Sequence, residues 1–233
     1  MSYMSAEKPK KRRKGGPAQI AREGQYVVED LRKRIANQVI PPGTKLLELQ
    51  LAQEFNISRT RVREVLSALE LRGLVKREPN KGAFVVKLEL TEVFEIYDVR
   101  EVLEGLSVRL ATDNAPSETW QELIEIFGEP MEKMVAANDL ENYEKNYAQM
   151  RQRVIEFARN PVLAAMLDSI YEKTRTIMRR VIILPGRAKK GLMENRAVLA
   201  AMHRGDSVEA EILKRANIRS GINDLKRYQD FVL

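Results

Sequence analysis

Hydrophobic residues recur at helical spacing in the first ninety residues of the chain. A helix is predicted over 26–40, and the Pro-Pro-Gly at 41–43 ends it because proline cannot continue a helix. Its inward positions are Val27, Leu31, Ile35 and Val39. A second short helix is predicted over 47–55, and a third begins at Ser58, a good N-cap, and ends near Gly73. The buried face of this third helix consists of Val62, Val65, Leu66 and Leu69.

A short β-hairpin follows the third helix. The segments "LVKRE" and "AFVVK" favour strands, and the Pro79-Asn80-Lys81-Gly82 sequence between them favours a tight turn. Three helices and a hairpin in about 65 residues predict a winged helix-turn-helix.

Helical patterns fill the remainder of the chain. Six helices are predicted to start at or near Thr91, Ser117, Asp139, Asn160-Pro161, Leu192 and Gly205-Asp206. The inward positions of the first are Ile96, Val99, Leu103, Leu106 and Leu110. Those of the third are Leu140, Tyr143, Tyr147, Met150 and Val154. The segment 128–130 is expected to kink the second helix. The predicted fold is therefore mainly α, a winged helix-turn-helix followed by an antiparallel all-helical bundle.

These patterns divide the chain into three parts. Residues 1–22 lack periodicity and contain a basic run, which predicts a disordered arm. The arm is either a solubilising terminus, a clamp on DNA or, from the basic run alone, a nuclear localisation signal. The winged domain is assigned to 23–88 and the helical domain to 89–233.

Composition limits the functions that the chain can have. With 233 residues and no cysteine, the chain is long enough for two cores but has no disulfide, cysteine nucleophile or thiolate metal site. No apolar run approaches the roughly 20 residues of a membrane span, and the N-terminus has no apolar core of a signal peptide. We therefore expect a soluble, cytoplasmic protein without membrane contact.

The net charge of +7 is unevenly distributed. Residues 1–90 contain 19 Lys and Arg against 10 Asp and Glu, whereas the remainder contains 21 against 23. The first part is thus suited to a polyanion such as double-stranded DNA, and the second is not.

The start of the third helix carries the candidate DNA contacts. Arg59, Thr60, Arg61 and Arg63 lie in its first turns, and in a recognition helix such residues reach base edges and phosphates of the major groove. The alternative is a solvated helix start, but cations there are unfavourable with the helix dipole and need a partner. The hairpin adds Lys76, Arg77 and Lys81 beside Gly82, which suits phosphate contact, although Gly82 also suits a turn with positive φ.

The stretch "PPGTKLLELQLAQEFNISRTRVREVLSALELRGLVKREPNKGAFV" resembles the DNA-binding domain of GntR-type bacterial transcription regulators. The resemblance implies that Arg59, Thr60, Arg61, Arg63 and Gly82 approach DNA. The helical remainder resembles the FadR-type effector domain, also called FCD, through "VREVLEGLSVRLA", "RVIEFARNP" and "AVLAAMHRGDSVEAEILKRAN".

Many FadR-type domains bind a divalent metal ion through one Asp and three His. The resemblance places these ligands at Tyr147, Arg151, Asn195 and Asn217, which are poor ligands or, for arginine, none at all. The single histidine, His203, makes no site alone and is interpreted as a surface or helix-end residue. We therefore expect neither a metal ion nor another cofactor.

The same positions suggest an anion site. Tyr147 and Arg151 share an inward stripe with Val154, and Asn195 and Asn217 match it on other helices. A buried Arg151 requires either an internal carboxylate or an anionic ligand. Arg100 aligns with a family arginine that helps to form the pocket. Its alternative role is an ion pair with Glu104, one turn further along the helix.

The sequence predicts a transcription regulator, with repression the expected outcome, whose affinity for DNA is controlled by a small anionic metabolite, a carboxylate. The resemblance and the small reach of one recognition helix imply a homodimer on a pseudo-palindromic operator. The first alternative is a DNA-binding dimer whose helical domain binds no ligand. An enzyme is the second, but the helical part has no Gly-rich phosphate loop and no metal cluster.

Overall fold

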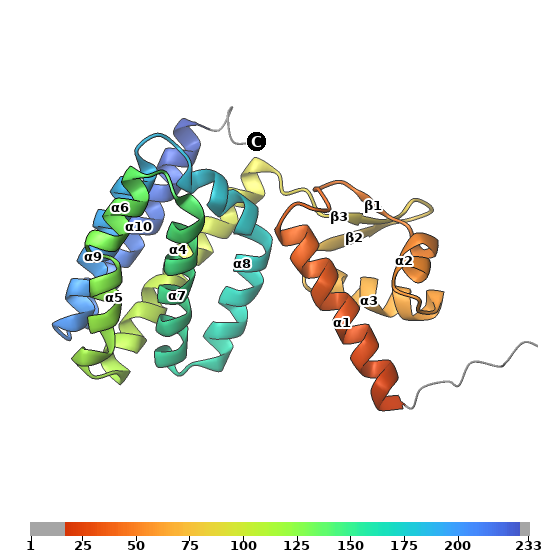
Figure 1. The fold of residues 1–233 in the computed structure, drawn as a ribbon, viewed down its shortest axis with the longest axis horizontal. Helices are drawn as coiled ribbons and strands as arrows, with labels where there is room; N and C mark the ends of the chain where they lie inside the picture. The colour runs from red at the N-terminus through yellow and green to blue at the C-terminus, as the bar shows by residue number, and fades with distance from the viewer. Residues whose placement is uncertain (1–16, 229–233) are drawn as a thin grey trace, which may run out of the picture. The chain divides into compact units, whose positions relative to one another are not determined.

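The computed structural model describes the backbone of residues 17–228 and, apart from that of Thr176, the side chains from Gly24 to Tyr228. The chain divides into two compact units (Figure 1). The first contains the chain up to Ile35 and again residues 39–85, and the second contains residues 36–38 and the chain from Val86 onward. The predicted fold class is confirmed: the first unit is a winged helix-turn-helix and the second is all-helical. None of the described helices is long and apolar enough to cross a membrane.

The first unit combines helices with a small sheet. Its elements are α1 (Pro17–Ala36), β1 (Lys45–Leu46), α2 (Glu48–Glu54), α3 (Arg59–Leu71), β2 (Val75–Glu78) and β3 (Gly82–Val85). The strands are antiparallel in the order β1-β3-β2, with Val75 opposite Val85 and Lys45 opposite Phe84. The predicted hairpin is therefore present. Strand β1 was not predicted because two residues are too few to show an alternating pattern.

The core of this unit lies between α1, α3 and the sheet. The predicted face of α3 is buried in full, and it packs with Leu31, Leu51, Val75 and Val85. Helix α1 differs from the prediction at both ends. It begins at Pro17, inside the segment expected to be disordered, and the rest of that arm lies outside the described residues. It ends at Ala36 because Gln38 takes a left-handed conformation (φ 57°), so Val39 is 69% exposed instead of inward.

The second unit is built from α4 (Leu90–Asn114), a 3₁₀ turn (Ser117–Trp120), α5 (Gln121–Ile126), α6 (Glu129–Ala136), α7 (Leu140–Ala158), α8 (Pro161–Ile182), α9 (Arg187–His203) and α10 (Ser207–Arg227). Asp139, Asn160 and Asp206 cap α7, α8 and α10 with side-chain hydrogen bonds, at the predicted starts. The segment from Ser117 is divided into a 3₁₀ turn and two short helices, where one kinked helix was expected.

The orientation of α4 corrects the sequence prediction. Helix α4 begins at Leu90, so Thr91 is not its cap, and Val99, predicted to point inward, is 54% exposed. The buried positions instead include Val93, Tyr97, Arg100, Glu104, Ser107 and Val108. The helix is rotated because Arg100 and Glu104 neutralise each other inside the bundle, which leaves part of the apolar face outside.

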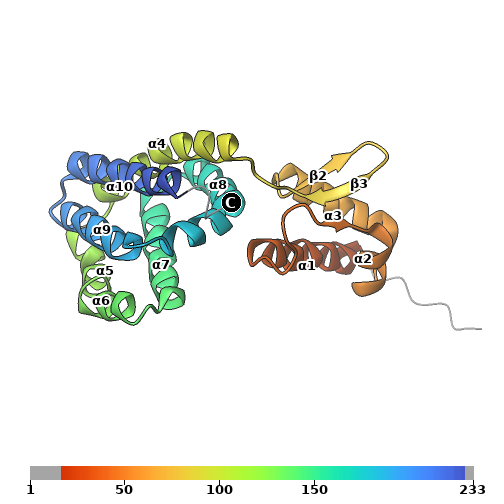
Figure 2. The same ribbon diagram turned by 90° about the horizontal axis from the view of Figure 1, so that it is seen from above.

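Helix α10 lies beside α4 and α9, as both ribbon views show (Figures 1 and 2). Gly105 permits the close approach of α4 to α10, since a Cβ there would lie 2.7 Å from Cγ of Arg215. This packing brings polar side chains of α4, α7, α9 and α10 together inside the bundle.

Candidate functional site

The start of α3 carries two exposed guanidinium groups. Ser58 Oγ accepts a hydrogen bond from the backbone N–H of Arg61 (3.2 Å), which fixes where α3 begins. The side chains of Arg59 and Arg63 are 60% and 59% exposed. Both donate to the Glu48 carboxylate of α2, Arg63 Nε at 2.9 Å and Arg59 at 3.2 Å. These hydrogen bonds lower the pKa of Glu48, so one carboxylate orients two of the predicted DNA-contacting arginines.

The other two predicted residues of α3 differ in exposure. Thr60 is exposed. Arg61 is partly buried because it forms an ion pair with Glu64 and packs against α1. A Cβ on Gly24 of α1 would lie 3.1 Å from Cδ of Arg61. Arg61 thus lies on a different side of α3 from Arg59 and Arg63.

The hairpin, which we call the wing (residues 75–85), presents Lys81 and Gly82 at its tip. Asn80 and Gly82 have positive φ values of 61° and 101°, so glycine at position 82 serves the turn. Lys81 is exposed and lies 3.1 Å from the Glu78 carboxylate. Both predicted wing residues are therefore accessible to a ligand as large as DNA.

Arg77, on strand β2, joins the wing to α3. It donates to the backbone oxygen of Arg63 (2.8 Å) and to Oγ of Ser67 (3.0 Å). A groove between α2, the start of α3 and the wing is lined by Arg59, Arg77 and Gly82, among others. The sequence places Arg77 in the wing, but no local pattern reveals that it fixes the position of the wing relative to α3.

A cavity of about 60 Å³ lies inside the helical unit. A volume of this size holds a few water molecules or a small carboxylate. Its walls come from α4, α7, α8, α9 and α10, and they include four of the five predicted ligand residues: Arg100, Tyr147, Asn195 and Asn217.

Arg151, the fifth predicted ligand residue, does not line this cavity. Its guanidinium lies over two aromatic rings, 4.5 Å from the centroid of Tyr171 and 5.1 Å from that of Tyr147. Its Nε is buried without a hydrogen-bond partner, and within the described residues it forms no ion pair with a carboxylate. The guanidinium is accommodated by these cation–π contacts, and at longer range its charge helps to lower the pKa of the internal carboxylate Glu104.

Glu104 of α4 is the centre of a buried ion cluster. Arg100 Nε donates to one carboxylate oxygen at 2.5 Å, and the Lys214 ammonium of α10 lies 2.9 Å from the other. The alternative role of Arg100 as a partner of Glu104 is therefore present, and it coexists with its place in the cavity wall. Burial would raise the pKa of Glu104, but the two cations outweigh it and lower that pKa to about 2.

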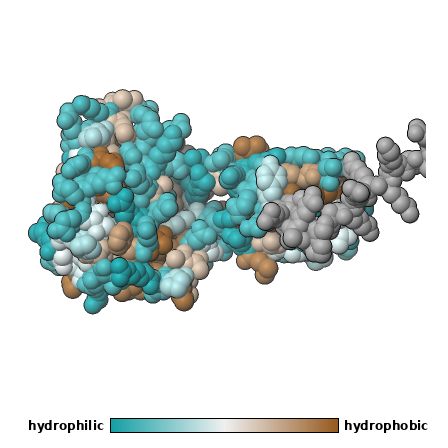
Figure 3. All heavy atoms as spheres, turned by 60° about the horizontal axis from the view of Figure 1, so that its bottom comes forward, coloured by the Kyte–Doolittle hydropathy of each residue, from teal (hydrophilic) through white to brown (hydrophobic). Residues whose placement is uncertain are grey.

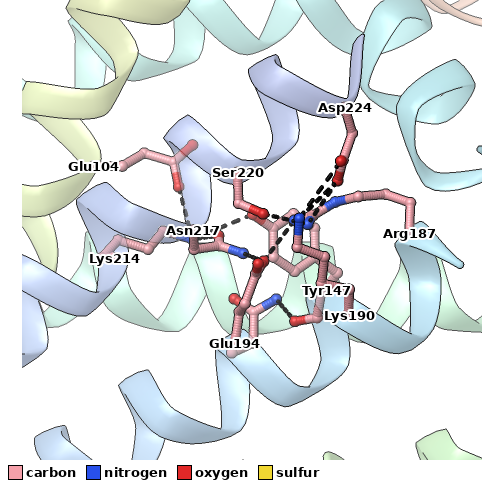
Figure 4. Close-up of polar contacts among 11 residues, drawn as sticks. Glu104, Tyr147, Arg187, Lys190, Glu194, Lys214, Asn217, Ser220 and Asp224 are labelled. Carbon is pink, nitrogen blue, oxygen red and sulfur yellow. Dashed lines mark hydrogen bonds and ion pairs between the residues drawn. The ribbon is translucent and has the colours of Figure 1, made fainter. Parts of the chain in front are cut away.

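A second set of ion pairs lies on the α9 side of the cavity (Figure 4). Arg187 donates to Glu194 at 2.7 Å and to Ser220 at 3.0 Å, and Asn217 donates to the same Glu194 oxygen at 2.7 Å. Arg187 lines the cavity, so a second guanidinium accompanies that of Arg100.

Lys214, Glu194 and Arg187 were not among the predicted site residues. Lys214 shares the inward face of α10 with Ala210 and Asn217, so spacing alone contained a signal for it. Because lysine is rarely buried, however, its spacing alone does not predict an inward position.

Asn195 presents an unpartnered acceptor. Its Nδ2 donates to the backbone oxygen of Gly191 at 2.7 Å, which orients the amide. Its Oδ1 is buried and has no hydrogen-bond partner. The cavity wall thus contains Arg100 and Arg187, each already paired with a carboxylate, and Asn195, whose Oδ1 has no partner.

The residues at the positions of the family metal ligands do not fit a divalent metal ion. Tyr147, Asn195 and Asn217 supply neutral oxygens and amides, and Arg151 is a cation that points elsewhere. Across residues 24–228, no three His, Asp or Glu side chains are grouped as metal ligands would be. His203 lies in the last turn of α9, with Nδ1 3.0 Å from the carbonyl oxygen of Ser117.

Known proteins share both parts of this architecture. Residues 95–220 match the FCD domain family, and residues 24–85 match the family described as bacterial regulatory proteins, gntR family. An uncharacterized HTH-type transcriptional regulator of Agrobacterium vitis is 37% identical over 114 residues, 47% of this chain and 66% of the relative. The gluconate operon transcriptional repressor of Bacillus licheniformis is 43% identical over 84 residues, 36% of this chain and 34% of the relative.

These alignments cover less than two thirds of the length of each relative. A solved structure, McbR/YncC of E. coli, matches 89% of this chain and 98% of its own with a TM-score of 0.71 at 21% identity, which supports the fold. The FCD match alone covers more than half of the chain, and the gntR match covers the winged unit before it. The chain therefore belongs to the GntR family of bacterial transcription regulators, a family of regulators and not of enzymes, with an FCD domain after its winged helix-turn-helix.

Proposed function

We propose that this regulator is a cytoplasmic, FadR-type repressor that binds a pseudo-palindromic operator as a homodimer and releases it when a small carboxylate enters the cavity. The observation that carries the ligand part is the composition of the cavity wall. Arg100 and Arg187, which are paired with Glu104 and Glu194, line the cavity, and Asn195 Oδ1 is a buried acceptor without a partner. A buried acceptor of this kind costs stability unless a ligand or water satisfies it.

The exposed side of the winged unit supports the DNA part. Arg59, Thr60 and Arg63 are proposed to contact the major groove, because a recognition helix inserts its first turns there. Arg61 is proposed to reach a phosphate beside the groove after breaking its pair with Glu64. Lys81 and Gly82 of the wing are proposed to contact the neighbouring backbone.

The homodimer is supported by the outer face of α4. Hydrophobic side chains reach the surface in patches among a hydrophilic majority (Figure 3). On α4 these include Val99 and Val102, which are 54% and 47% exposed. Homodimer interfaces are more apolar than ordinary surface, so we propose that this face meets the same face of a second chain.

Thermal unfolding against a panel of small carboxylates and phosphorylated metabolites tests the ligand part. A ligand present at 100 times its dissociation constant stabilises by about 2.7 kcal/mol, which shifts the midpoint by several degrees. The stabilising compound should then weaken binding to a DNA duplex selected from a random pool by the protein itself.

The alternative is a dimer whose helical unit binds no ligand. Under that reading, the free Asn195 oxygen is satisfied by water alone. Midpoints that stay constant across the whole panel, with DNA affinity also unchanged, would support this alternative and contradict the proposal.

A further inference from the structure

The buried ammonium of Lys214 has the surroundings of a bound cation. It lies 2.9 Å from Glu104 Oε2, 3.2 Å from the Tyr147 hydroxyl and 3.4 Å from Asn217 Oδ1 (Figure 4). The ammonium donates hydrogen bonds to the Tyr147 hydroxyl and to Asn217 Oδ1, and it forms an ion pair with the Glu104 carboxylate. The three acceptors come from α4, α7 and α10, and the Lys214 side chain is only 4% exposed.

This cation site overlaps the positions at which the family resemblance places metal ligands. Tyr147 and Asn217 are two of those four positions, and here both contact Lys214. Burial would lower the pKa of Lys214, but the charge of Glu104 outweighs it and raises that pKa, so the group is charged. A divalent ion placed among the same oxygens would meet the ammonium with a like charge.

We propose that the Lys214 ammonium is the resident cation of this site, in the place of a metal ion, and that it prepares the cavity wall for an anion. Lys214 acts through its neighbours and is a positioning residue. Because the Tyr147 oxygen accepts from Lys214, the Tyr147 hydrogen is directed elsewhere and can be donated into the cavity that this side chain lines. The last step rests on the proposed anion binding, whereas the cation assignment does not.

Chemical rescue tests the cation assignment without knowledge of the effector. Lys214→Ala removes a fragment that n-propylammonium can replace. We expect the variant to unfold about 10 °C below the parent, because a buried carboxylate loses one of its partners. Millimolar n-propylammonium should restore several degrees to the variant and none to the parent. Neutral n-propanol, of the same size, should restore none.

Lys190→Ala is the matched control. Lys190 also pairs with a carboxylate of α10, Asp224 at 3.3 Å, but its side chain is 52% exposed. Its removal should cost little and should show no rescue by n-propylammonium. Equal rescue of Lys214→Ala by n-propanol and n-propylammonium would show that the side chain only fills space, and this would overturn the proposal.

Titration of the untagged parent protein with Zn²⁺ and Ni²⁺ in a calorimeter gives an outcome even if Lys214→Ala does not fold. The proposal expects no stoichiometric binding in the helical unit and no change of midpoint in EDTA. Binding of one ion per chain that Asn217→Ala abolishes would overturn it.

Sodium acetate, a small carboxylate that the cavity can hold, separates the two proposals. Acetate should raise the unfolding midpoint of the parent, and in Lys214→Met this rise should be at least tenfold smaller while the fold is retained. An unweakened acetate response in Lys214→Met would contradict the positioning role. If no anion changes the unfolding midpoint of the parent protein, the proposed effector is contradicted. The rescue by n-propylammonium then still tests the assignment of Lys214 as the cation.

Discussion

At the scale of single residues, paired charges define both candidate sites. Glu48 orients Arg59 and Arg63 at the start of α3, and Glu104 balances Arg100 and Lys214 inside the bundle. The first set is exposed, so its ion pairs contribute little to stability and are free to exchange for phosphate. The second is buried and holds two cations against one carboxylate, so loss of Glu104 would leave two uncompensated charges.

Acid should destabilise the helical unit through Glu104. Its pKa is about 2 in the folded chain, below the ordinary 4.5. Because the folded value is the lower one, the stabilisation is complete above pH 4.5 and is lost as the pH falls toward 2. We expect the unfolding midpoint to fall across this window.

The matched variants for this pH series are Glu104→Gln and Glu141→Gln. Glu104→Gln should be less stable at neutral pH and should show a flatter midpoint across the acidic window. Glu141 is exposed and pairs with Lys145 at 3.1 Å, so its variant should follow the parent. Parallel curves for the parent and Glu104→Gln would contradict this reading of the ion cluster.

Arg63→Ala should weaken DNA binding by about tenfold or more, because a good arginine contact to a base contributes about 1–3 kcal/mol. The measurement is fluorescence anisotropy with the protein-selected duplex at several salt concentrations. Lys33→Ala removes one exposed charge from α1 that is not among the proposed DNA contacts, and it should change affinity little. Equal losses in both variants would indicate that Arg63 contributes only net charge.

At the scale of elements, periodicity and capping residues were enough to predict most helices. Ser58, Asp139, Asn160 and Asp206 were read as helix starts, and each accepts a backbone hydrogen bond there. The buried face of α3 was also predicted in full, because its charged and apolar positions separate cleanly.

The face of α4 could not be predicted in the same way. Arg100 and Glu104 can be buried because they form an ion pair with each other. Glu104 also pairs with Lys214, which lies on a helix more than one hundred residues later in the chain. Long-range compensation leaves no local pattern in the sequence. The same reason explains why four cavity residues were identified from the family resemblance but Lys214, Glu194 and Arg187 were not.

Removal of the α10 cap should cost about 1 kcal/mol, since an Asp N-cap satisfies an otherwise unpaired backbone N–H. Asp206 accepts from the backbone of Glu209 at 3.0 Å. Asp206→Ala should therefore lower the calorimetric midpoint by about 2–4 °C. Asp98→Ala, at an exposed position of α4, should leave the midpoint unchanged. A similar fall of the midpoint in both variants would exclude capping as the cause.

At the scale of the whole molecule, the proposed regulator needs two chains. One recognition helix reads too few base pairs for specificity in a genome, so a pseudo-palindromic operator and a two-fold symmetric protein go together. Effector binding can then alter DNA affinity only if it favours one arrangement of the two winged units over another.

Val102→Glu tests the proposed dimer surface on α4. A charge at the centre of an apolar interface should shift the mass measured by light scattering from two chains to one. DNA affinity should fall with it, since the half-sites are no longer bound together. Val162→Glu, at a more exposed position at the start of α8 (64% against 47% for Val102), should remain dimeric. A Val102→Glu variant that stays dimeric would place the interface elsewhere.

Under our proposal, the cation beside the cavity is the Lys214 side chain, which is part of the protein and does not have to be bound from solution. A regulator that needs a bound metal ion responds to two concentrations, that of the metabolite and that of the ion. It does not respond when either of them is scarce. A sensor with a lysine in that position reports one concentration. Its output would therefore follow the supply of its carboxylate in metal-starved and metal-replete cells alike.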